Sequence, residues 1–229
     1  MSGKSNFLIT GAGSGFGRAL ATEALSSGYS VVGTVRSEAA RQDFVAMDPA
    51  RARAIMLDVT DFTAIGPEVA QAERDVGPID VLVNSAGYGH EGTLEESPLE
   101  EMRRQFDVNV FGAVAMIKAV LPFMRERRRG HIVNITSMAG YVGLAGIPYY
   151  AGSKFALEGI SEVLANEVRG FGIKVTAVAP ASFWTDWAGR SMIRSPQSIA
   201  GYDLLFDPIR RARAAASRQV IRPKLLVRS

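Results

Sequence analysis

A serine, a tyrosine and a lysine have the types and spacing needed for proton transfer. They are Ser137, Tyr150 and Lys154, in the order Ser-x12-Tyr-x3-Lys. Residues four apart share one face of a helix, so Lys154 should lie one turn below Tyr150. A nearby ammonium group favours the phenolate and is expected to lower the tyrosine pKa from its usual value of about 10.

This arrangement predicts chemistry at an oxygen atom. Tyr150 would give a proton to a carbonyl oxygen in reduction or take one from an alcohol in oxidation. Ser137 would hydrogen-bond the same oxygen and stabilise its developing charge. Each residue also has a structural interpretation: Ser137 as a strand-end cap, Tyr150 as a packed aromatic and Lys154 as a solvated helix lysine. Only their combination favours catalysis.

A glycine-rich turn near the start of the chain predicts a nucleotide site. The segment Gly11-Ala-Gly-Ser-Gly-Phe-Gly17 follows a short apolar run and precedes a helical pattern. Glycines let the backbone approach a pyrophosphate that lies on a helix N-terminus. A tight turn without a ligand is the alternative. The predicted contacts in this turn are Gly11, Ser14, Gly15, Phe16 and Gly17.

Strand ends later in the chain extend this predicted site. Arg36 follows the second predicted strand, where an acid would favour NAD, and a guanidinium suits the 2′-phosphate of NADP. NADP is therefore expected rather than NAD, although an exposed loop arginine is the simpler interpretation. Asp58 would accept from the adenine amino group or cap the next turn. The remaining predicted contacts are Val59, Asn84, Ala86 and Gly87.

Short apolar runs alternate with longer helix-period segments, which is typical of a parallel sheet with crossover helices. We expect an α/β, Rossmann-like doubly wound sheet in the order 3-2-1-4-5-6, with ligands at the carboxyl ends of the strands. The predicted strands are 6–10, 31–35, 54–57, 81–84, 131–136 and 174–179. The predicted helices are 15–26, 38–45, 63–75, 99–127 and 150–169, with a kink at Pro122 in the fourth.

Composition narrows the class of protein. The 229 residues include no cysteine, and the two histidines lack ligand spacing, so neither a disulfide nor a metal site is expected. We also expect no membrane span and no secretory leader, and hence a cytoplasmic protein. The formal charge of +3 comes from the basic segment 208–229, without which the chain is net acidic. A nucleic-acid partner is therefore not expected.

From Asn6 to about Ser195 the chain resembles the short-chain dehydrogenase/reductases. The resemblance implies an NAD(P)-dependent enzyme that acts on CH–OH groups and commonly forms oligomers, here a homodimer. It also implies that Asn109 bends a helix and holds a water near Lys154, and that Tyr150 and Lys154 also contact the cofactor. The motifs are the glycine turn, Asp58, Asn84-Ser-Ala-Gly87, Asn109, Ile135-Thr-Ser137, Tyr150-x3-Lys154 and Pro180-Ala-Ser-Phe-Trp-Thr185.

The segment after the sixth predicted strand supplies the nicotinamide contacts and the pocket. By resemblance, Pro180, Phe183 and Thr185 contact the nicotinamide, and Ala181 replaces a usual glycine. An apolar pocket predicts a hydrophobic ketone, aldehyde or alcohol as substrate. Its expected walls are Tyr88, Met138, Tyr141, Tyr149, Phe183, Trp184, Trp187 and Met192, with Tyr149 packed against apolar surface.

The end of the chain departs from the family pattern. Residues 1–190 are expected to form one dinucleotide-binding and catalytic domain, and 191–229 a substrate lid with an atypical basic tail. The family's seventh strand is expected to be missing, and we hypothesise a frameshift near residue 218. The alternative function is a nucleotide-binding regulatory protein, or a weakly active one, impaired by this terminus.

Overall fold

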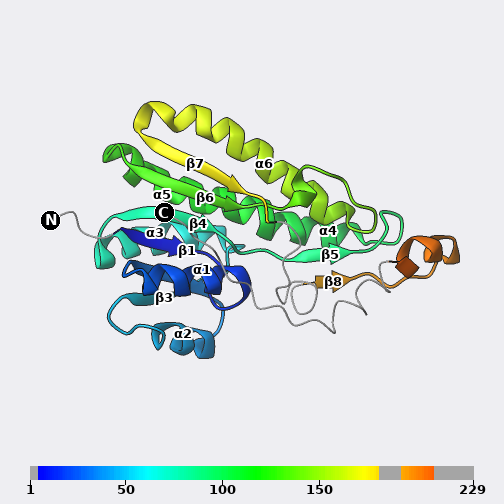
Figure 1. Cartoon of the computed structure of the whole chain (residues 1–229), viewed down its shortest axis with the longest axis horizontal. Coiled ribbons are helices and arrows are strands. Elements are labelled where there is room, and N and C mark those ends of the chain that lie inside the picture. The colour runs from blue at the N-terminus through cyan, green and yellow to red at the C-terminus, as the bar shows by residue number, and fades with distance from the viewer. Residues whose placement is uncertain (1–4, 181–191, 209–229) are drawn as a thin grey trace.

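The structure, a computed structural model, describes residues 5–180 and 192–208 of the chain (Figure 1). Its main element is a sheet of six parallel strands in the order β3-β2-β1-β4-β6-β7. This confirms the predicted fold class and strand order, since the short β5 only shifts the numbering. The strands are β1 (Asn6–Ile9), β2 (Ser30–Val35), β3 (Ala52–Met56), β4 (Ile79–Asn84), β6 (Gly130–Ile135) and β7 (Ile173–Val178). The predicted absence of a seventh strand concerns the segment after 208, which lies outside the described residues.

Helices connect the strands, as right-handed crossovers between parallel strands require. Two of them, α1 and α2, have the bounds that the sequence pattern predicts. Ser37 caps α2 by accepting a hydrogen bond from the Ala40 amide at 3.2 Å, and Asp61 caps α3 in the same way. The helices are α1 (Gly15–Ser26), α2 (Glu38–Val45), α3 (Phe62–Val76), α4 (Leu99–Phe106), α5 (Ala113–Glu126) and α6 (Pro148–Val168).

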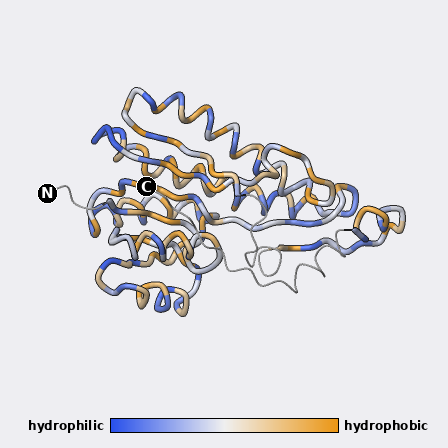
Figure 2. The backbone as a smooth tube through the Cα atoms, in the orientation of Figure 1, coloured by the Kyte–Doolittle hydropathy of each residue, from blue (hydrophilic) through white to orange (hydrophobic). Residues whose placement is uncertain are grey.

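Alternating side chains along each strand divide the core into two layers. On β1, Ile9 packs with α1 and α2 residues such as Leu25 and Phe44. Its neighbour Leu8 points to the opposite face, where residues of α3, α5 and α6 such as Met116 form the larger cluster. Figure 2 shows the apolar residues concentrated along the strands and the helix faces against them. Both faces of the central strands are thereby covered, which explains their continuous apolar sequence.

The long helical stretch Leu99–Glu126 is interrupted by a π-helical segment, η1 (Asp107–Gly112). Pro122, where a kink is expected, lies inside α5, which continues through that residue to Glu126. In the described part of the chain this stretch alone is long and apolar enough to cross a bilayer. Within the molecule the α5 part of this stretch packs against the main sheet, because it contacts β4 and β6 as well as α3.

A second, two-stranded sheet was not predicted. Its strands are β5 (Gly89–Glu91), directly after β4, and β8 (Met192–Arg194), and they pair in parallel. Both are three residues long, which is too short for a periodic pattern to indicate them. A short 3₁₀ turn, η5 (Ala200–Tyr202), follows β8 and leads into helical residues 203–208. The small sheet thus joins residues 192–194 to residues 89–91, which follow the carboxyl end of β4 next to the predicted site.

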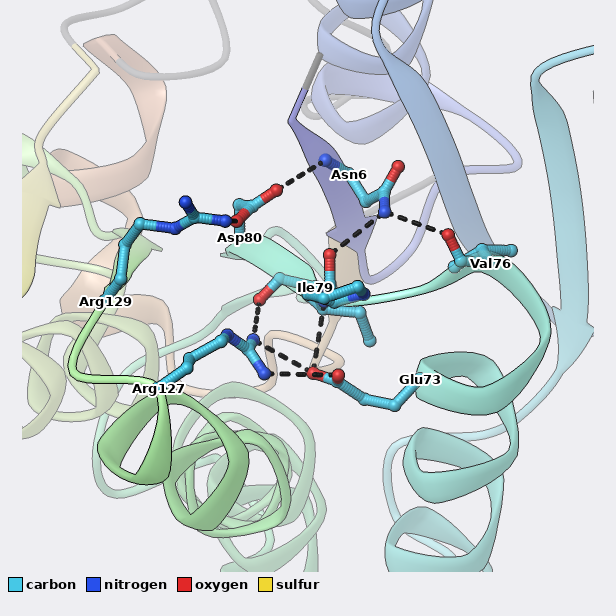
Figure 3. Close-up of polar contacts among 8 residues, drawn as sticks. Asn6, Glu73, Val76, Ile79, Asp80, Arg127 and Arg129 are labelled. Carbon is cyan, nitrogen blue, oxygen red and sulfur yellow. Dashed lines mark hydrogen bonds and ion pairs between the residues drawn. The ribbon is translucent and has the colours of Figure 1, made fainter. Parts of the chain in front are cut away.

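The amino ends of β1 and β4 are held by a network of polar side chains (Figure 3). Glu73 of α3 receives two hydrogen bonds from the guanidinium of Arg127 and one from the Ile79 amide. Asp80 accepts from Arg129 at 2.7 Å and from the Asn6 amide at 3.1 Å. These contacts join α3, β1, β4 and the turn after α5 at the edge of the sheet that is remote from the glycine turn.

Candidate active site

The predicted site residues that the structure describes follow the strands of the main sheet at its carboxyl edge or lie in the helices next to it. All six strands of this sheet run in parallel and therefore end on the same side. The Thr10 hydroxyl joins two of these ends by accepting hydrogen bonds from the Ser85 and Ala86 amides, both at 3.0 Å. The glycine turn after β1 and the loop after β4 are thus fixed to each other, although they are 70 residues apart in sequence.

The glycine turn is built around close backbone contacts. Gly11 has a φ of +68°, and a Cβ atom there would lie 2.9 Å from the Ala86 Cα. At Gly17 a Cβ atom would lie 2.6 Å from the Gly11 carbonyl oxygen. Gly15 also has a positive φ, +57°, but a Cβ atom there would meet nothing within 4 Å. Two glycines therefore close the turn, while the third faces open space at the start of α1.

The N-terminus of α1 fits a phosphate group. Ser14 stands at the cap position, but its side chain makes no capping hydrogen bond. The first amides of the helix thus lack a side-chain acceptor, and together with the helix dipole they favour an anion. Ser14 and Gly15 are exposed, and the Phe16 side chain is half-buried. This geometry agrees with the predicted pyrophosphate cradle.

The two residues predicted to contact the adenosine lie together. The Arg36 guanidinium is 3.9 Å from an Asp58 carboxylate oxygen, with 79% of the arginine side chain exposed. The other Asp58 oxygen accepts from the amide and the hydroxyl of Thr60, so Asp58 also shapes the turn after β3. Val59 is buried and packs against Gly112 of η1. Arg36 is the exposed cation at the end of β2.

The segment after β4 divides into a structural part and an exposed part. Asn84 is buried, and its amide group donates to Asn134 at 2.9 Å and to the Ala113 carbonyl at 3.4 Å. Its side chain therefore holds β4 to β6 and α5. Ala86 touches the glycine turn, and Gly87 is exposed. These two positions are where the chain can approach a ligand closely.

The three residues predicted to transfer the proton are brought together. Ser137 follows β6, and its side chain is hydrogen-bonded to the Tyr150 hydroxyl. The Lys154 Nζ lies 5.7 Å from the centre of the Tyr150 ring, on the same face of α6. Lys154 also donates a hydrogen bond to the Ile135 carbonyl at 2.8 Å. Both side chains are buried, with 6% of each residue exposed.

The electrostatics of this cluster correct one expectation. Burial raises the pKa of Tyr150 above 10, and the hydrogen bond with Ser137 opposes that rise only in part. The ammonium group of Lys154 therefore does not bring the tyrosine pKa below its usual value here. Burial also lowers the pKa of Lys154 to about 8, with Glu158 opposing. Desolvation disfavours the charged form of both groups and is the largest cause of both shifts.

Asn109 lies in the middle of η1, consistent with the helix bend that the family resemblance implies. Its amide group donates to the Tyr88 carbonyl and to the Ser153 hydroxyl, both at 3.0 Å, and its oxygen accepts from the Tyr88 amide. Ser153 in turn donates to the Tyr150 carbonyl at 2.7 Å. Asn109 thus connects the loop after β4 to the first turns of α6.

The predicted pocket walls fall into three groups. Met138 and Tyr141 are exposed, and the half-buried Tyr88 has a pKa raised to about 12, chiefly by burial. Tyr149 is buried, and its hydroxyl donates a hydrogen bond to the Ser97 carbonyl at 2.7 Å. Met192 is buried in β8. The other predicted walls and nicotinamide contacts, Phe183, Trp184, Thr185 and Trp187, lie outside the described residues, while Pro180 accepts from the Met138 amide.

Several residues that build the site were not predicted from the sequence. Thr10 and Thr34 fix the glycine turn, Thr34 by accepting from the Gly11 amide at 3.1 Å. Each is a buried polar residue at the end of an apolar strand, a signal that could have identified it. Ser153 and the Ile135 carbonyl gave no such signal. A serine inside a helix is common, and every residue has a main-chain carbonyl, so the sequence does not single out either group.

Comparison with known proteins agrees with this geometry. Residues 5–193 match the family described as short chain dehydrogenase. A short-chain dehydrogenase structure from Streptomyces avermitilis superposes with a TM-score of 0.87 at 41% identity, covering 95% of this chain and 79% of that one. The structure of ElxO with NADP bound gives 0.77 at 30% identity, covering 80% and 76%.

Among curated proteins, the chain is 43% identical to the 3-ketodihydrosphingosine reductase of Bacteroides thetaiotaomicron over 178 residues. That match covers 78% of this chain and 64% of the reductase. The chain spans about two thirds of the length of the first curated relatives that it matches. The family match covers most of the chain, and the chain therefore belongs to the short-chain dehydrogenase family, as the sequence motifs indicated.

Proposed function

We propose that this member of the short-chain dehydrogenase family is an NADP-dependent oxidoreductase for a hydrophobic ketone or aldehyde and the matching alcohol. The observation that carries the proposal is the hydrogen-bonded pair Ser137–Tyr150, with the Lys154 ammonium 5.7 Å from the tyrosine ring. The pair lies at the carboxyl edge of the sheet, as does the glycine turn, where the Ser14 side chain makes no capping hydrogen bond to α1. Relatives named as oxidoreductases and reductases support this assignment.

Tyr150 would act as the general acid in reduction. Its raised pKa keeps the phenol protonated at neutral pH, and that is the form needed to protonate a carbonyl oxygen. Ser137 would hydrogen-bond the same oxygen as negative charge develops on it. When bound, the nicotinamide supplies the hydride. The buried Lys154, charged below its pKa of about 8, would stabilise the phenolate left after proton transfer.

Hydrogen bonds to neighbouring main-chain and side-chain groups would position these residues. Lys154 is held by the Ile135 carbonyl, and Asn109 fixes α6 through Ser153. The Asn109 oxygen lies 3.0 Å, and the Lys154 Nζ 3.8 Å, from the place where a Gly87 Cβ would stand. The absence of a side chain at Gly87 thus lets the main chain pass close to both groups, which supports a role for Asn109 in holding a water beside Lys154.

Cofactor choice would depend on Arg36. Its exposed guanidinium at the end of β2 suits the 2′-phosphate of NADP through charge-assisted hydrogen bonds. The NADP bound by the structural relative ElxO supports the same choice. Replacing Arg36→Ala should weaken NADPH binding by about tenfold to a hundredfold and leave NADH binding within about twofold. Equal losses for both nucleotides in fluorescence titrations would remove this basis for preferring NADP.

The apolar side chains next to Ser137 support a hydrophobic substrate. Met138 and Tyr141 expose 53% and 61% of their surface on the turn that follows the serine. A relative named as a 3-ketodihydrosphingosine reductase agrees with a ketone as the reducible group. We place the enzyme in the cytoplasm, with residues 1–190 as the catalytic domain and 191–229 as the lid and tail.

A homodimer through α5 and α6 is the proposed assembly. These helices form an apolar groove lined by residues such as Ile117, Leu121 and Ile160. Exposed Val163 and Phe155 continue the apolar surface along α6. A second copy could bury both faces symmetrically. Val163→Glu should shift the mass measured by light scattering from dimer to monomer, whereas Glu167→Gln at the groove's end should not.

The central test is NADPH oxidation measured against a panel of apolar ketones and aldehydes. Wild-type protein should turn over, and Tyr150→Phe should lower kcat by about 10²- to 10⁴-fold. Tyr149→Phe is the matched control, because it removes a neighbouring hydroxyl that donates to Ser97. Nucleotide binding without turnover of any substrate in the panel would instead support the regulatory alternative.

A further inference from the structure

His90 is a buried histidine that the proposed chemistry does not use. It lies in β5 with no exposed surface, two residues after Tyr88. Its Nε2 is 2.9 Å from the Ser195 hydroxyl, and its ring stacks on Tyr149 with centroids 5.2 Å apart. Burial lowers the pKa of His90 below 6.5, so the imidazole is neutral at neutral pH. A neutral ring can make both contacts without a desolvated charge.

These two contacts join segments that are far apart in sequence. Ser195 directly follows β8, and its amide donates to the Glu91 carbonyl at 2.9 Å. Tyr149 lies in the first turn of α6, immediately before Tyr150, and its hydroxyl donates to the Ser97 carbonyl. His90 stands between them. It therefore connects the segment that follows the main sheet to the helix that carries the proposed acid and its lysine.

Gly92, directly after β5, packs closely against the same segments. A Cβ atom at Gly92 would lie 2.4 Å from the Ser97 hydroxyl and 2.9 Å from the Ser195 Cβ. The Gly92 amide also donates to the Gly146 carbonyl, just before α6. Further out, Glu96 accepts from the Ser198 and Ile199 amides. The segment 192–199 is thus held along its length by residues 89–97.

We propose that His90 is a positioning residue that fastens β8 to the start of α6 and so holds residues 192–199 in register with Tyr150. This rests on the proposed function for the part that concerns substrate. The ring supplies both links at once: a hydrogen bond to Ser195 and a stacked face against Tyr149. His90 touches no reacting atom, so its loss should act on substrate binding more than on chemistry.

Two variants test the hydrogen bond between His90 and Ser195. His90→Phe keeps a stacked ring and removes the hydrogen bond to Ser195, while Ser195→Ala removes the other partner of that bond. Both should raise the KM of the carbonyl substrate by about fivefold to tenfold, the worth of one hydrogen bond. In both, kcat and NADP affinity should stay within about twofold. The double variant should be no worse than the worse single variant, because one bond is lost in each case.

Amide hydrogen exchange on the free protein gives a readout that does not need turnover. Exchange in 89–91 and 192–195 should be faster in both variants and unchanged in 6–35. Tyr202→Phe is the control, since it removes only the exposed contact to Glu95. Unchanged exchange, additive effects in the double variant, or a loss confined to kcat would overturn the role of His90. If wild-type protein reduces no substrate, the proposed function fails. The hydrogen-exchange result alone then tests whether His90 holds β8 to the start of α6.

Discussion

The two edges of the main sheet use polar side chains in opposite ways. At the amino edge, Glu73 and Asp80 are paired with Arg127 and Arg129, and main-chain amides complete their hydrogen bonds (Figure 3). At the carboxyl edge, a buried lysine has no carboxylate partner at hydrogen-bond distance among the described residues, and burial shifts its pKa to about 8. The carboxylates of the amino edge are thus neutralised by arginines, whereas the buried lysine of the carboxyl edge is held by a main-chain carbonyl.

This difference indicates where stability is given up for function. Parallel strands end on a common side, and the helix N-termini there bring partial positive charge to the same place. Unpaired groups at that edge cost folding free energy unless a ligand binds them. The amino edge has no such constraint, so its charges can be paired within the protein. Substitutions at the two edges should therefore separate activity from stability.

The largest expected effect is at the carboxyl edge. Lys154→Met removes the ammonium that would stabilise the Tyr150 phenolate and should lower kcat by about 10²-fold or more. It should not lower stability at pH 7, because a desolvated charge is replaced by an apolar chain of similar length. Steady-state kinetics and urea unfolding would measure the two effects. A variant that loses stability and activity in parallel would contradict the assigned role.

The opposite outcome is expected at the amino edge. Arg127→Met leaves Glu73 without its cation, and 9% of the Glu73 side chain is exposed. Breaking such a buried pair should cost about 3 kcal/mol of unfolding free energy, with kcat within about twofold of wild type. Arg103→Met, in an exposed pair with Glu100, is the control and should cost less than about 1 kcal/mol. Urea unfolding of both variants measures the difference.

Thr10 tests whether the carboxyl edge also contains purely structural groups. Thr10→Val removes the acceptor for the Ser85 and Ala86 amides and should cost about 2 kcal/mol. It should also weaken nucleotide binding, because the glycine turn loses its link to the loop after β4. Thr10→Ser keeps the hydroxyl and serves as control in calorimetry and nucleotide titration. Equal behaviour of the two variants would show that the hydroxyl does not hold the turn.

The smallest expected effect is a pH dependence of stability. The folded-state pKa of Lys154 is about 8 against 10.5 for the free side chain, so the unfolded chain binds more protons in that window. Stability from this group therefore rises with pH, by about 1 kcal/mol between pH 7 and 9. Urea unfolding of wild type and Lys154→Met at both pH values isolates this contribution. An identical pH slope in the two proteins would mean that the lysine is not desolvated.

The sequence determined the fold and the identity of the proposed catalytic group. Apolar runs, helix-period segments and glycine positions are local patterns, and they located every strand of the main sheet and all of its crossover helices to within a few residues. Tyr150 and Lys154 are four residues apart on one helix, so their proximity followed from helix geometry, and Ser137 was placed near them by its position at the end of a predicted strand. The proximity of Arg36 and Asp58 followed from their positions just after β2 and β3, which are neighbouring strands.

Tertiary structure alone decided the features that depend on burial and on contacts between distant segments. The sequence pattern predicted a lowered tyrosine pKa from a nearby charge, but desolvation, which depends on the whole fold, raises it. The turn of Asn84 into the core and the junction of His90 with Ser195 likewise join residues 50 or more apart. Local spacing carries no information about such contacts, because they are set by how the layers pack.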